Sequence, residues 1–218
     1  MIHASGLALQ HQGGPRLSFP DLAVPQGHTL LLRGDSGSGK STLLAMLAGL
    51  LAPSQGHLQV AGTDPWSLTP ARRDAWRGRT LGLLPQRAWI NPALSVWQHL
   101  ALPAVCTGET PDTAAIDRLL QRLGLAAWAH QPARALSGGQ VQRLALGRAL
   151  VRQPQVVLAD EPTASLDDRH TAQVLEQLRE LGGRATVVIA THDARVIQAL
   201  RGRPDTHVCT LPPAGGPA

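Results

Sequence analysis

Short apolar runs alternate along this chain with longer stretches of helical composition. Residues 28–34, 155–160 and 185–193 are apolar runs of strand length that end in glycine or an acidic residue. Residues 41–51 and 167–183 follow two of these runs and have the length and composition of helices. Because strands that alternate with helices pair in parallel, this order predicts an α/β fold with helices on the faces of a mostly parallel sheet.

The middle of the chain departs from this alternation. Residues 88–153 contain several prolines and helical segments such as residues 112–125, and they show little strand character. We therefore expect residues 88–153 to form a helical subdomain inserted into an α/β core of residues 1–87 and 154–211. The proline- and glycine-rich tail, residues 212–218, is expected to be disordered.

Length and composition are those of one globular domain. A chain of 218 residues with 43% hydrophobic residues can bury its own core. Cys106 and Cys209 show no metal-ligand or redox spacing, so we expect a reduced cytosolic protein without a disulfide. No segment has the build of an export signal or of a membrane span, so we expect a chain that is neither exported nor embedded.

The net charge of +5 does not by itself indicate a nucleic-acid partner. Lys40 is the only lysine, and the arginines are scattered with acidic residues between them instead of forming a stripe. Such scatter is typical of a solvated surface, and we expect no nucleic acid among the partners. The nine histidines are also dispersed, which argues against a structural metal site.

Residues 34–41 carry the chemistry of a phosphate-binding loop. They read GDSGSGKS, fit the pattern GxxxxGK[ST], and lie between a predicted strand and a predicted helix, as that motif requires. Backbone N–H groups of the loop would surround phosphates, Lys40 would neutralise the β and γ oxygens, and Ser41 would ligate Mg²⁺. The nucleotide-binding residues expected here are Gly34, Asp35, Ser36, Gly37, Ser38, Gly39, Lys40, Ser41 and Thr42.

Acidic and polar side chains follow the other predicted strands. Residues 156–161 read VVLADE, in which Asp160 would hold Mg²⁺ through water and Glu161 would be the general base for an attacking water. His192 follows the next strand at the same sheet edge, where it would contact the γ-phosphate. Gln86 ends another apolar run and would contact both Mg²⁺ and the attacking water. From the residues alone, His192 and Gln86 are weak candidates, since a lone residue of this kind is usually an ordinary loop residue.

A second anion-binding motif lies far from the first in sequence. Residues 135–143 read ALSGGQVQR, a serine and two glycines followed by the opening of a helix. Backbone N–H groups freed at a helix start favour negative charge, and glycine lets a phosphate approach the backbone. A single bound nucleotide does not explain why one chain carries two such sites.

Taken in order, these motifs resemble those of the ATP-binding subunit of an ABC (ATP-binding cassette) transporter. The matching segments are the loop at 34–42, Gln86, the signature LSGGQ at 136–140, VVLADE at 156–161, SLD at 165–167 and His192. The resemblance extends over residues 3 to about 210, and the segments RDAWRGRTLGLLPQ and LSVWQHLALP are similar to the lipoprotein-release and macrolide-export branch. It implies a P-loop NTPase core with a mostly parallel sheet, an antiparallel β extension at the N-terminus and an inserted α-helical subdomain.

The resemblance also explains the second motif. In this family two subunits stack head to tail, and each ATP lies between the P-loop of one subunit and the signature of the other. The signature residues that would contact the ATP of a second copy of this chain are Leu136, Ser137, Gly138, Gly139 and Gln140. The implied catalytic residues are Glu161, His192, Lys40 and Gln86, and the implied metal ligands are Ser41, Gln86 and Asp160.

The implied function is ATP hydrolysis that powers transport across the membrane. ATP and Mg²⁺ are the implied cofactors, and the implied partners are an integral-membrane permease and a second copy of this chain. The subunit would be peripheral, on the cytoplasmic face of the inner membrane. An ABC ATPase that acts on nucleic acid would need a long coiled coil between Gln86 and Ser137, or a second cassette, and the sequence has neither. A degenerate, non-catalytic cassette would lack catalytic groups that this sequence retains.

Two positions depart from the family pattern. The chain contains no tyrosine, and His11 falls nearest the position of the aromatic residue that usually stacks on adenine. An imidazole can stack with less area than a phenol ring, so His11 is either the adenine contact or an ordinary surface residue. Gly147 replaces the usual alanine of the signature helix, which we expect to cost less than about 1 kcal/mol of helix propensity.

The segment beside Gln86 is rich in large apolar residues. Trp89, Ile90 and Trp97 would either receive a helix of the permease or belong to the core, and both interpretations stay open.

Overall fold

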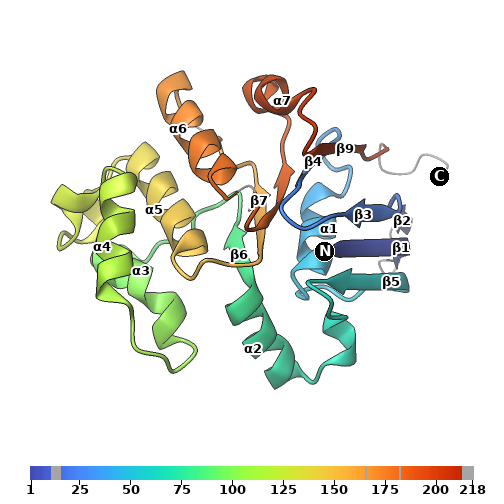
Figure 1. Cartoon of the computed structure of the whole chain (residues 1–218), viewed down its shortest axis with the longest axis horizontal. Helices are drawn as coiled ribbons and strands as arrows, with labels where there is room; N and C mark the ends of the chain where they lie inside the picture. Colours follow the sequence, from blue (N-terminus) through green and yellow to red (C-terminus); the bar gives the residue numbers. More distant parts are fainter. Residues whose placement is uncertain (11–15, 165, 182, 213–218) are drawn as a thin grey trace.

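The computed structural model describes residues 1–10, 16–164, 166–181 and 183–212 (Figure 1). His11, Ser165 of the SLD segment and residues 213–218 of the predicted tail lie outside these ranges. The strands are β1 (Ile2–Gln10), β2 (Arg16–Ser18), β3 (Leu22–Val24), β4 (Thr29–Arg33), β5 (Gln55–Val60), β6 (Leu81–Leu84), β7 (Val156–Asp160), β8 (Thr186–Ala190) and β9 (Thr206–Thr210). The α-helices are α1 (Lys40–Leu47), α2 (Pro70–Thr80), α3 (Val96–Val105), α4 (Thr113–Arg122), α5 (Gly138–Leu150), α6 (Asp168–Arg179) and α7 (Ala194–Leu200). Short 3-10 helices cover Pro65–Ser67, Ala126–Trp128 and Ala133–Ala135.

A parallel sheet forms the centre of the molecule, which confirms the predicted α/β fold. Its strand order is β6-β7-β8-β4-β9, and each neighbouring pair runs parallel. Consecutive side chains point to opposite faces, so Val187 and Ile189 enter one hydrophobic cluster while Val188 and Ala190 enter another. The first cluster includes residues of α5, α6 and α7, and the second includes residues of α1 and β1. β8 is buried along its whole length, as a strand covered on both faces must be.

An antiparallel sheet lies on the side of α1 that faces away from the parallel sheet, as Figure 1 shows. Its central strand, β1, pairs antiparallel with β2, β3 and β5. Helix α1 contacts β7 and β8 of the parallel sheet and β5 of the antiparallel sheet. The N-terminal β extension implied by the family resemblance is therefore present, and α1 is held between two sheets.

Three helices, α3, α4 and α5, lie in the chain between β6 and β7 and pack on one another (Figure 1). Their apolar sides meet around fully buried leucines such as Leu100, Leu120 and Leu144. Helix α5 also contacts β6 of the parallel sheet, so the helix that carries the signature is anchored directly to the α/β core.

Gly147 of α5 has a packing role that the sequence did not reveal. A Cβ at Gly147 would lie 2.5 Å from Cδ1 of Leu123 and 3.0 Å from Cδ2 of Leu100. In this chain the space of the usual alanine methyl is filled by two core leucines. The expectation that the glycine only lowers helix propensity was therefore incomplete, because its missing side chain lets α3 and α4 approach α5.

Helix α1 is shorter than its sequence pattern predicted. The apolar run continues to residue 51, but the helix ends at Leu47. Gly49 has a positive φ of 64°, and a Cβ there would lie 3.0 Å from Pro65 and 3.3 Å from Trp76. The chain turns at this glycine because the segment after β5 packs against it.

Among the described residues, no helix is long and apolar enough to cross a membrane.

We predict that Gly82→Ala destabilises the fold strongly. A Cβ at Gly82 of β6 would lie 2.2 Å from the carbonyl oxygen of Ala149 and 2.9 Å from Cγ of Pro154. Because the nearest atom belongs to the backbone of α5, relief requires moving the helix, and we expect a loss of about 2 kcal/mol or more in the free energy of unfolding. Urea unfolding followed by circular dichroism measures it.

Gly78→Ala on α2 is the matched control, since only a methyl carbon of Thr107 lies near the added Cβ, at 3.0 Å. We expect this variant to change the free energy of unfolding by less than about 1 kcal/mol. Equal stability of the two variants would contradict the close approach of α5 to β6.

Candidate active site

The predicted phosphate-binding loop lines a cavity of about 440 Å³ at the carboxyl ends of the parallel strands. The loop connects β4 to α1, and the strands β7 and β8 bring further side chains to the same edge. The residues that line the cavity are Leu17, Gly34, Asp35, Ser36, Gly37, Gly39, Lys40, Ser41, Thr42, Gln86, Asp160, Glu161 and His192. Almost the whole predicted P-loop therefore lines the same cavity as the candidate site residues of three other segments, which are Gln86, Asp160 with Glu161, and His192.

The N-terminus of α1 differs from those of the other helices near it. The residue before it, Gly39, has φ 92° and offers no side-chain cap. Helices α3, α4, α5, α6 and α7 each begin with a Ser or Asp whose side chain accepts a backbone N–H. At α1 the first N–H groups are left for another acceptor, and a phosphate is the group that fits there. A Cβ at Gly39 would also approach Phe19 to 3.1 Å, while one at Gly37 would meet no atom within 4 Å.

Lys40 and Ser41 occupy the first turn of α1 and point to different partners. The Nζ of Lys40 donates to the carbonyl oxygens of Gly34 at 2.6 Å and Asp35 at 2.9 Å. Its charge is therefore held over the loop. The Oγ of Ser41 donates to Oδ2 of Asp160 at 2.6 Å. This pair offers the hard oxygen donors that Mg²⁺ prefers.

The carboxyl group of Asp160 sits in an environment that disfavours its charge. Burial, together with the neighbouring carboxylate of Glu161, raises the pKa of Asp160, while the Ser41 hydrogen bond and the charge of Lys40 oppose that shift. A divalent cation between these oxygens would remove the electrostatic penalty, so the residues fit Mg²⁺.

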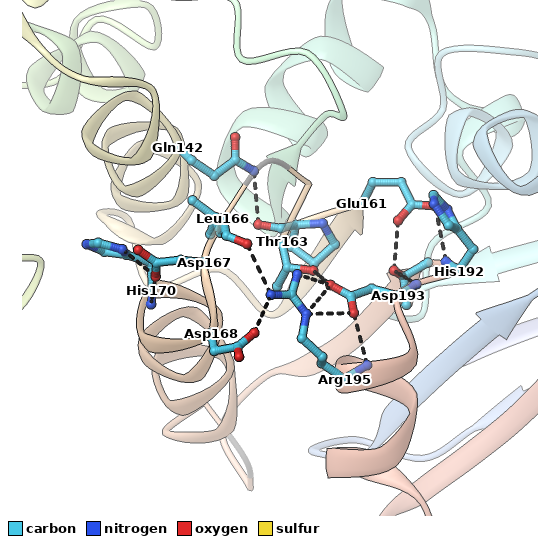
Figure 2. A network of polar contacts seen from close by, with 12 residues as sticks. Gln142, Glu161, Thr163, Leu166, Asp167, Asp168, His170, His192, Asp193 and Arg195 are labelled. Carbon is cyan, nitrogen blue, oxygen red and sulfur yellow. Dashed lines mark hydrogen bonds and ion pairs between the residues drawn. The ribbon is translucent and has the colours of Figure 1, made fainter.

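Glu161 is fixed by its backbone and by hydrogen bonds to both carboxylate oxygens. Its φ is 48°, in the left-handed region that residues other than glycine rarely adopt. Oε1 accepts from the Nδ1 of His192 at 2.5 Å, and Oε2 accepts from the hydroxyl of Thr191 at 2.7 Å (Figure 2). The Glu161 side chain is only 7% exposed, whereas that of His192 is 78% exposed. A buried carboxylate is thus joined to a histidine that faces the cavity.

The signature residues do not line this cavity. None of residues 136–140 is among the described residues that line the cavity. Ser137 forms the N-cap of α5, where its Oγ accepts from the N–H of Gln140 at 3.4 Å and its own N–H donates to Oε1 of Gln140 at 2.7 Å. The two anion-binding motifs of one chain therefore do not meet in this structure.

Of the predicted nucleotide contacts that the structure describes, only Ser38 does not line the cavity. His11 lies outside the described residues, so its role stays a prediction. Ser38 is buried behind the loop, and its backbone N–H donates to the carbonyl oxygen of Asp35 at 3.1 Å. Leu17 of β2 lines the cavity without having been predicted.

A second polar cluster supports the site from behind, and sequence reasoning missed it. Oδ2 of Asp193 accepts from the hydroxyl of Thr163 at 2.7 Å and from Nη2 of Arg195 at 2.7 Å (Figure 2). Hydrogen bonding from the Arg195 guanidinium, and then from Thr163, holds the pKa of Asp193 well below its usual range. No motif marks Thr163 or Arg195, and only the fold brings them to Asp193.

A cavity that can surround a polyphosphate, and that has a buried carboxylate at its edge, is typical of a P-loop protein that hydrolyses a nucleoside triphosphate. Comparison with known proteins gives the family. Residues 17–164 match the family model described as ABC transporter. The chain belongs to the ABC transporter family, and it is an ATP-binding and ATP-hydrolysing subunit of such a transporter.

Similar sequences include ATPases of the branch expected from the sequence. The lipoprotein-releasing system ATP-binding protein LolD of Anaeromyxobacter dehalogenans is 39% identical over 204 residues, which cover 89% of this chain and 85% of that protein. The macrolide export ATP-binding/permease protein MacB of Rhodopseudomonas palustris is 41% identical over 179 residues, which cover 81% of this chain and 27% of that protein.

Two similar solved structures are dimers of one cassette. The dimeric bacterial ABC transporter cassette MJ0796 matches with a TM-score of 0.83 and 26% identity, covering 99% of this chain and 97% of that one. Its post-hydrolysis dimer, bound to ADP and Pi, matches with a TM-score of 0.85 and 25% identity, with the same coverage.

We predict that Asp193→Asn destabilises the protein at neutral pH and much less in acid. The folded-state pKa of Asp193 lies below its unfolded value of about 3.9, so its carboxylate stabilises the fold above about pH 4. That contribution begins to fall below about pH 4 and disappears only as the pH falls through the much lower folded-state pKa. Thermal melts from pH 7 to pH 2 should therefore show a constant gap between the two midpoints above about pH 5 and a gap that narrows steadily below about pH 4.

Asp117→Asn, at an exposed position of α4, is the control for a general charge effect. Its midpoint should follow that of the unmodified protein at every pH. A constant gap between Asp193→Asn and the unmodified protein down to pH 2 would contradict the ion pair with Arg195.

Proposed function

We propose that two copies of this chain hydrolyse Mg²⁺-ATP at their shared interface and thereby drive a membrane permease. The observation that carries this proposal is the separation of two half-sites in one chain. The uncapped N-terminus of α1 lines the cavity, whereas Ser137 at the N-terminus of α5 lies outside it. A head-to-tail pair brings the second half-site of one copy onto the first half-site of the other. The dimeric state of similar cassettes supports this arrangement.

The residues of the cavity have distinct roles in the proposed reaction. The loop N–H groups and Lys40 bind the phosphates and neutralise their charge. Ser41, Asp160 and Gln86 would hold Mg²⁺, which when bound would withdraw charge from the phosphate oxygens. Glu161 accepts the proton of the attacking water.

His192 orients that base. In the structure the Nδ1 of His192 and the hydroxyl of Thr191 hold the two carboxylate oxygens of Glu161. The carboxylate is thereby kept at the edge of the cavity, and the exposed imidazole, which lines the cavity, would contact a γ-phosphate bound there. Loss of that phosphate removes contacts to both copies at once, which favours opening of the pair.

The membrane side of the proposal rests on residues 88–153, the proposed helical subdomain. Trp89 is 69% exposed, with the Arg87 guanidinium 5.2 Å from its ring centre. Nη1 of Arg148 donates to the carbonyl oxygen of Trp89 at 2.6 Å, which fixes this segment to α5. Ile90 and Trp97 pack partly against the core instead. We propose that Trp89 meets the permease, and that this places the subunit at the cytoplasmic face of the inner membrane.

The relatives support a branch for this transporter. LolD is named for lipoprotein release and MacB for macrolide export, and both match most of this chain. We propose that this chain powers a permease of the same type, one that moves an amphipathic cargo out of the inner membrane.

We predict that Glu161→Gln traps an ATP-bound dimer. An amide cannot accept the proton of the attacking water, so hydrolysis should fall by about 100-fold or more while ATP still bridges the two copies. Gel filtration with millimolar ATP and Mg²⁺ should show the dimer, and ATP without Mg²⁺ should give no turnover in the unmodified protein.

The two capping serines provide a matched control for the shared site. Ser137 and Ser95 both form a capping box, Ser137 with Gln140 and Ser95 with Gln98. In the Glu161→Gln background, Ser137→Ala should abolish the dimer, whereas Ser95→Ala removes the same kind of cap and should leave it intact. A dimer that forms equally well in both variants would show that the signature is not part of the nucleotide site.

We predict that Trp89→Ala weakens the association with the membrane permease that co-purifies with the unmodified protein. Losing a large exposed aromatic side chain at an interface removes an anchor, so co-purification should fall by about 10-fold. ATP hydrolysis by the isolated subunit should not change. Val208→Ala, which removes an exposed apolar side chain on β9, should have no effect, and equal behaviour of the two variants would place the permease contact elsewhere.

A further inference from the structure

Arg195 joins segments that are far apart in the sequence. It lies in the first turn of α7, three residues after His192. Its Nε and Nη2 bind the carboxylate of Asp193, with Nε donating to Oδ1 at 3.0 Å and Nη2 donating to Oδ2 at 2.7 Å. Its Nη1 donates to the carbonyl oxygen of Leu166 at 3.1 Å and to Oδ1 of Asp168 at 2.9 Å (Figure 2). One guanidinium thus connects the segment after β8 with the segment before α6.

Leu166 leads from Arg195 to the signature. Its side chain is buried in the larger hydrophobic cluster, and its Cδ2 lies 3.7 Å from where a Cβ would stand on Gly139. The position of Leu166 therefore decides what packs beneath the second glycine of the signature. A shift of the Leu166 backbone would change the packing against the first turn of α5, because Gly139 has no Cβ between Leu166 and the helix backbone.

The same segment is held from the other side by the signature helix. The Nε2 of Gln142 on α5 donates to the carbonyl oxygen of Pro162 at 3.0 Å (Figure 2). Gln142 is buried, and Pro162 directly follows Glu161. The chain between Glu161 and Asp168 is thus tied to α5 at its start by Gln142 and to α7 at its end by Arg195.

The contacts of Arg195 are unequal. Asp168 is 91% exposed, and an ion pair to such a carboxylate contributes little. Asp193 is 15% exposed and is also held by Thr163, and the Leu166 oxygen is a fixed backbone acceptor. The fork geometry of the guanidinium binds these two acceptors at once, which a lysine at this position would not reproduce.

We infer that Arg195 is a positioning residue that couples the cavity of one copy to the signature of the same copy. Glu161 and His192 respond to the γ-phosphate bound by this chain, and Asp193 follows His192 directly. Arg195 passes a displacement of that segment to the Leu166 backbone, and Leu166 passes it to Gly139. The signature that caps the partner's ATP is therefore set by the state of the chain's own site. This inference rests on the proposed shared site.

The test separates nucleotide binding from pairing. Arg195→Gln removes the charge and most of the fork, and it is made both alone and in the Glu161→Gln background. Binding of ADP, followed by titration calorimetry, should stay within about 2-fold of the unmodified protein because the P-loop is untouched. The ATP concentration at half-maximal dimer formation should rise by about 10-fold, and kcat for ATP hydrolysis should fall by a similar factor. Asp168→Asn keeps the Leu166 and Asp193 bonds, so its dimerisation should shift by less than about 2-fold.

Arg201→Gln, at the exposed far end of α7, is the matched control, and it should behave as the unmodified protein in every assay. Arg195→Lys should recover less than half of the lost kcat. Dimerisation and kcat of Arg195→Gln equal to those of Arg201→Gln would overturn the inference. So would a loss of dimerisation that comes with weaker ADP binding, since that result indicates a folding defect that reaches the P-loop. Failure of Glu161→Gln itself to dimerise, with Arg195 intact, would instead overturn the shared site.

Discussion

The structure depends on one helix that begins without a cap. Gly39 ends the loop after β4 and gives α1 no side chain to accept its first N–H groups. An isolated helix start of this kind is poorly satisfied, and the surrounding fold has to hold it in place. It does so by burying α1 between two sheets, with Leu43, Met46 and Leu47 fully enclosed. The burial that fixes α1 therefore also keeps its N-terminus directed into the cavity, where an anion can complete it.

The other half-site, at the N-terminus of α5, is capped by its own side chains. Helix α5 is capped by its own Ser137 and Gln140, and it is anchored to β6 by the missing side chain of Gly82. It is complete as a helix and needs no ligand for its stability. Binding a phosphate there uses groups that remain after capping, so the signature is suited to a nucleotide that arrives already bound by another molecule. One helix start needs an anion and the other does not, which agrees with the proposal that the two half-sites meet only when two copies pair.

Much of the core could be predicted from the sequence because its signals are local. β4 and β7 were expected within one residue of their observed ends, since each is an apolar run closed by a glycine or an acid, whereas β8 ends at Ala190, three residues before the end of its expected run. The antiparallel sheet was expected only from the family resemblance, because β2 and β3 are three residues long and carry no periodic pattern. Helix α2 was not expected at all, as its exposed arginines show little apolar periodicity.

The site shows the same division. Lys40, Asp160 and Glu161 lie within motifs, and their meeting follows from parallel strands ending at one edge. The contacts of Thr191 and Arg195 could not be foreseen, because they depend on how loops from different strands turn towards each other. The close packing of Leu123 against Gly147 could not be predicted for a related reason. A glycine in a helix shows its packing role only when the residues around it are known.

The left-handed backbone at Glu161 has a consequence for how this protein can change. Glycine or asparagine would adopt that conformation at lower backbone cost, by roughly 1 kcal/mol, but neither supplies the carboxylate that Thr191 and His192 bind. The strain relieved and the hydrogen bonds lost are of similar size, so stability alone gives selection little reason to keep or to replace the glutamate. Only turnover distinguishes the glutamate from its replacements.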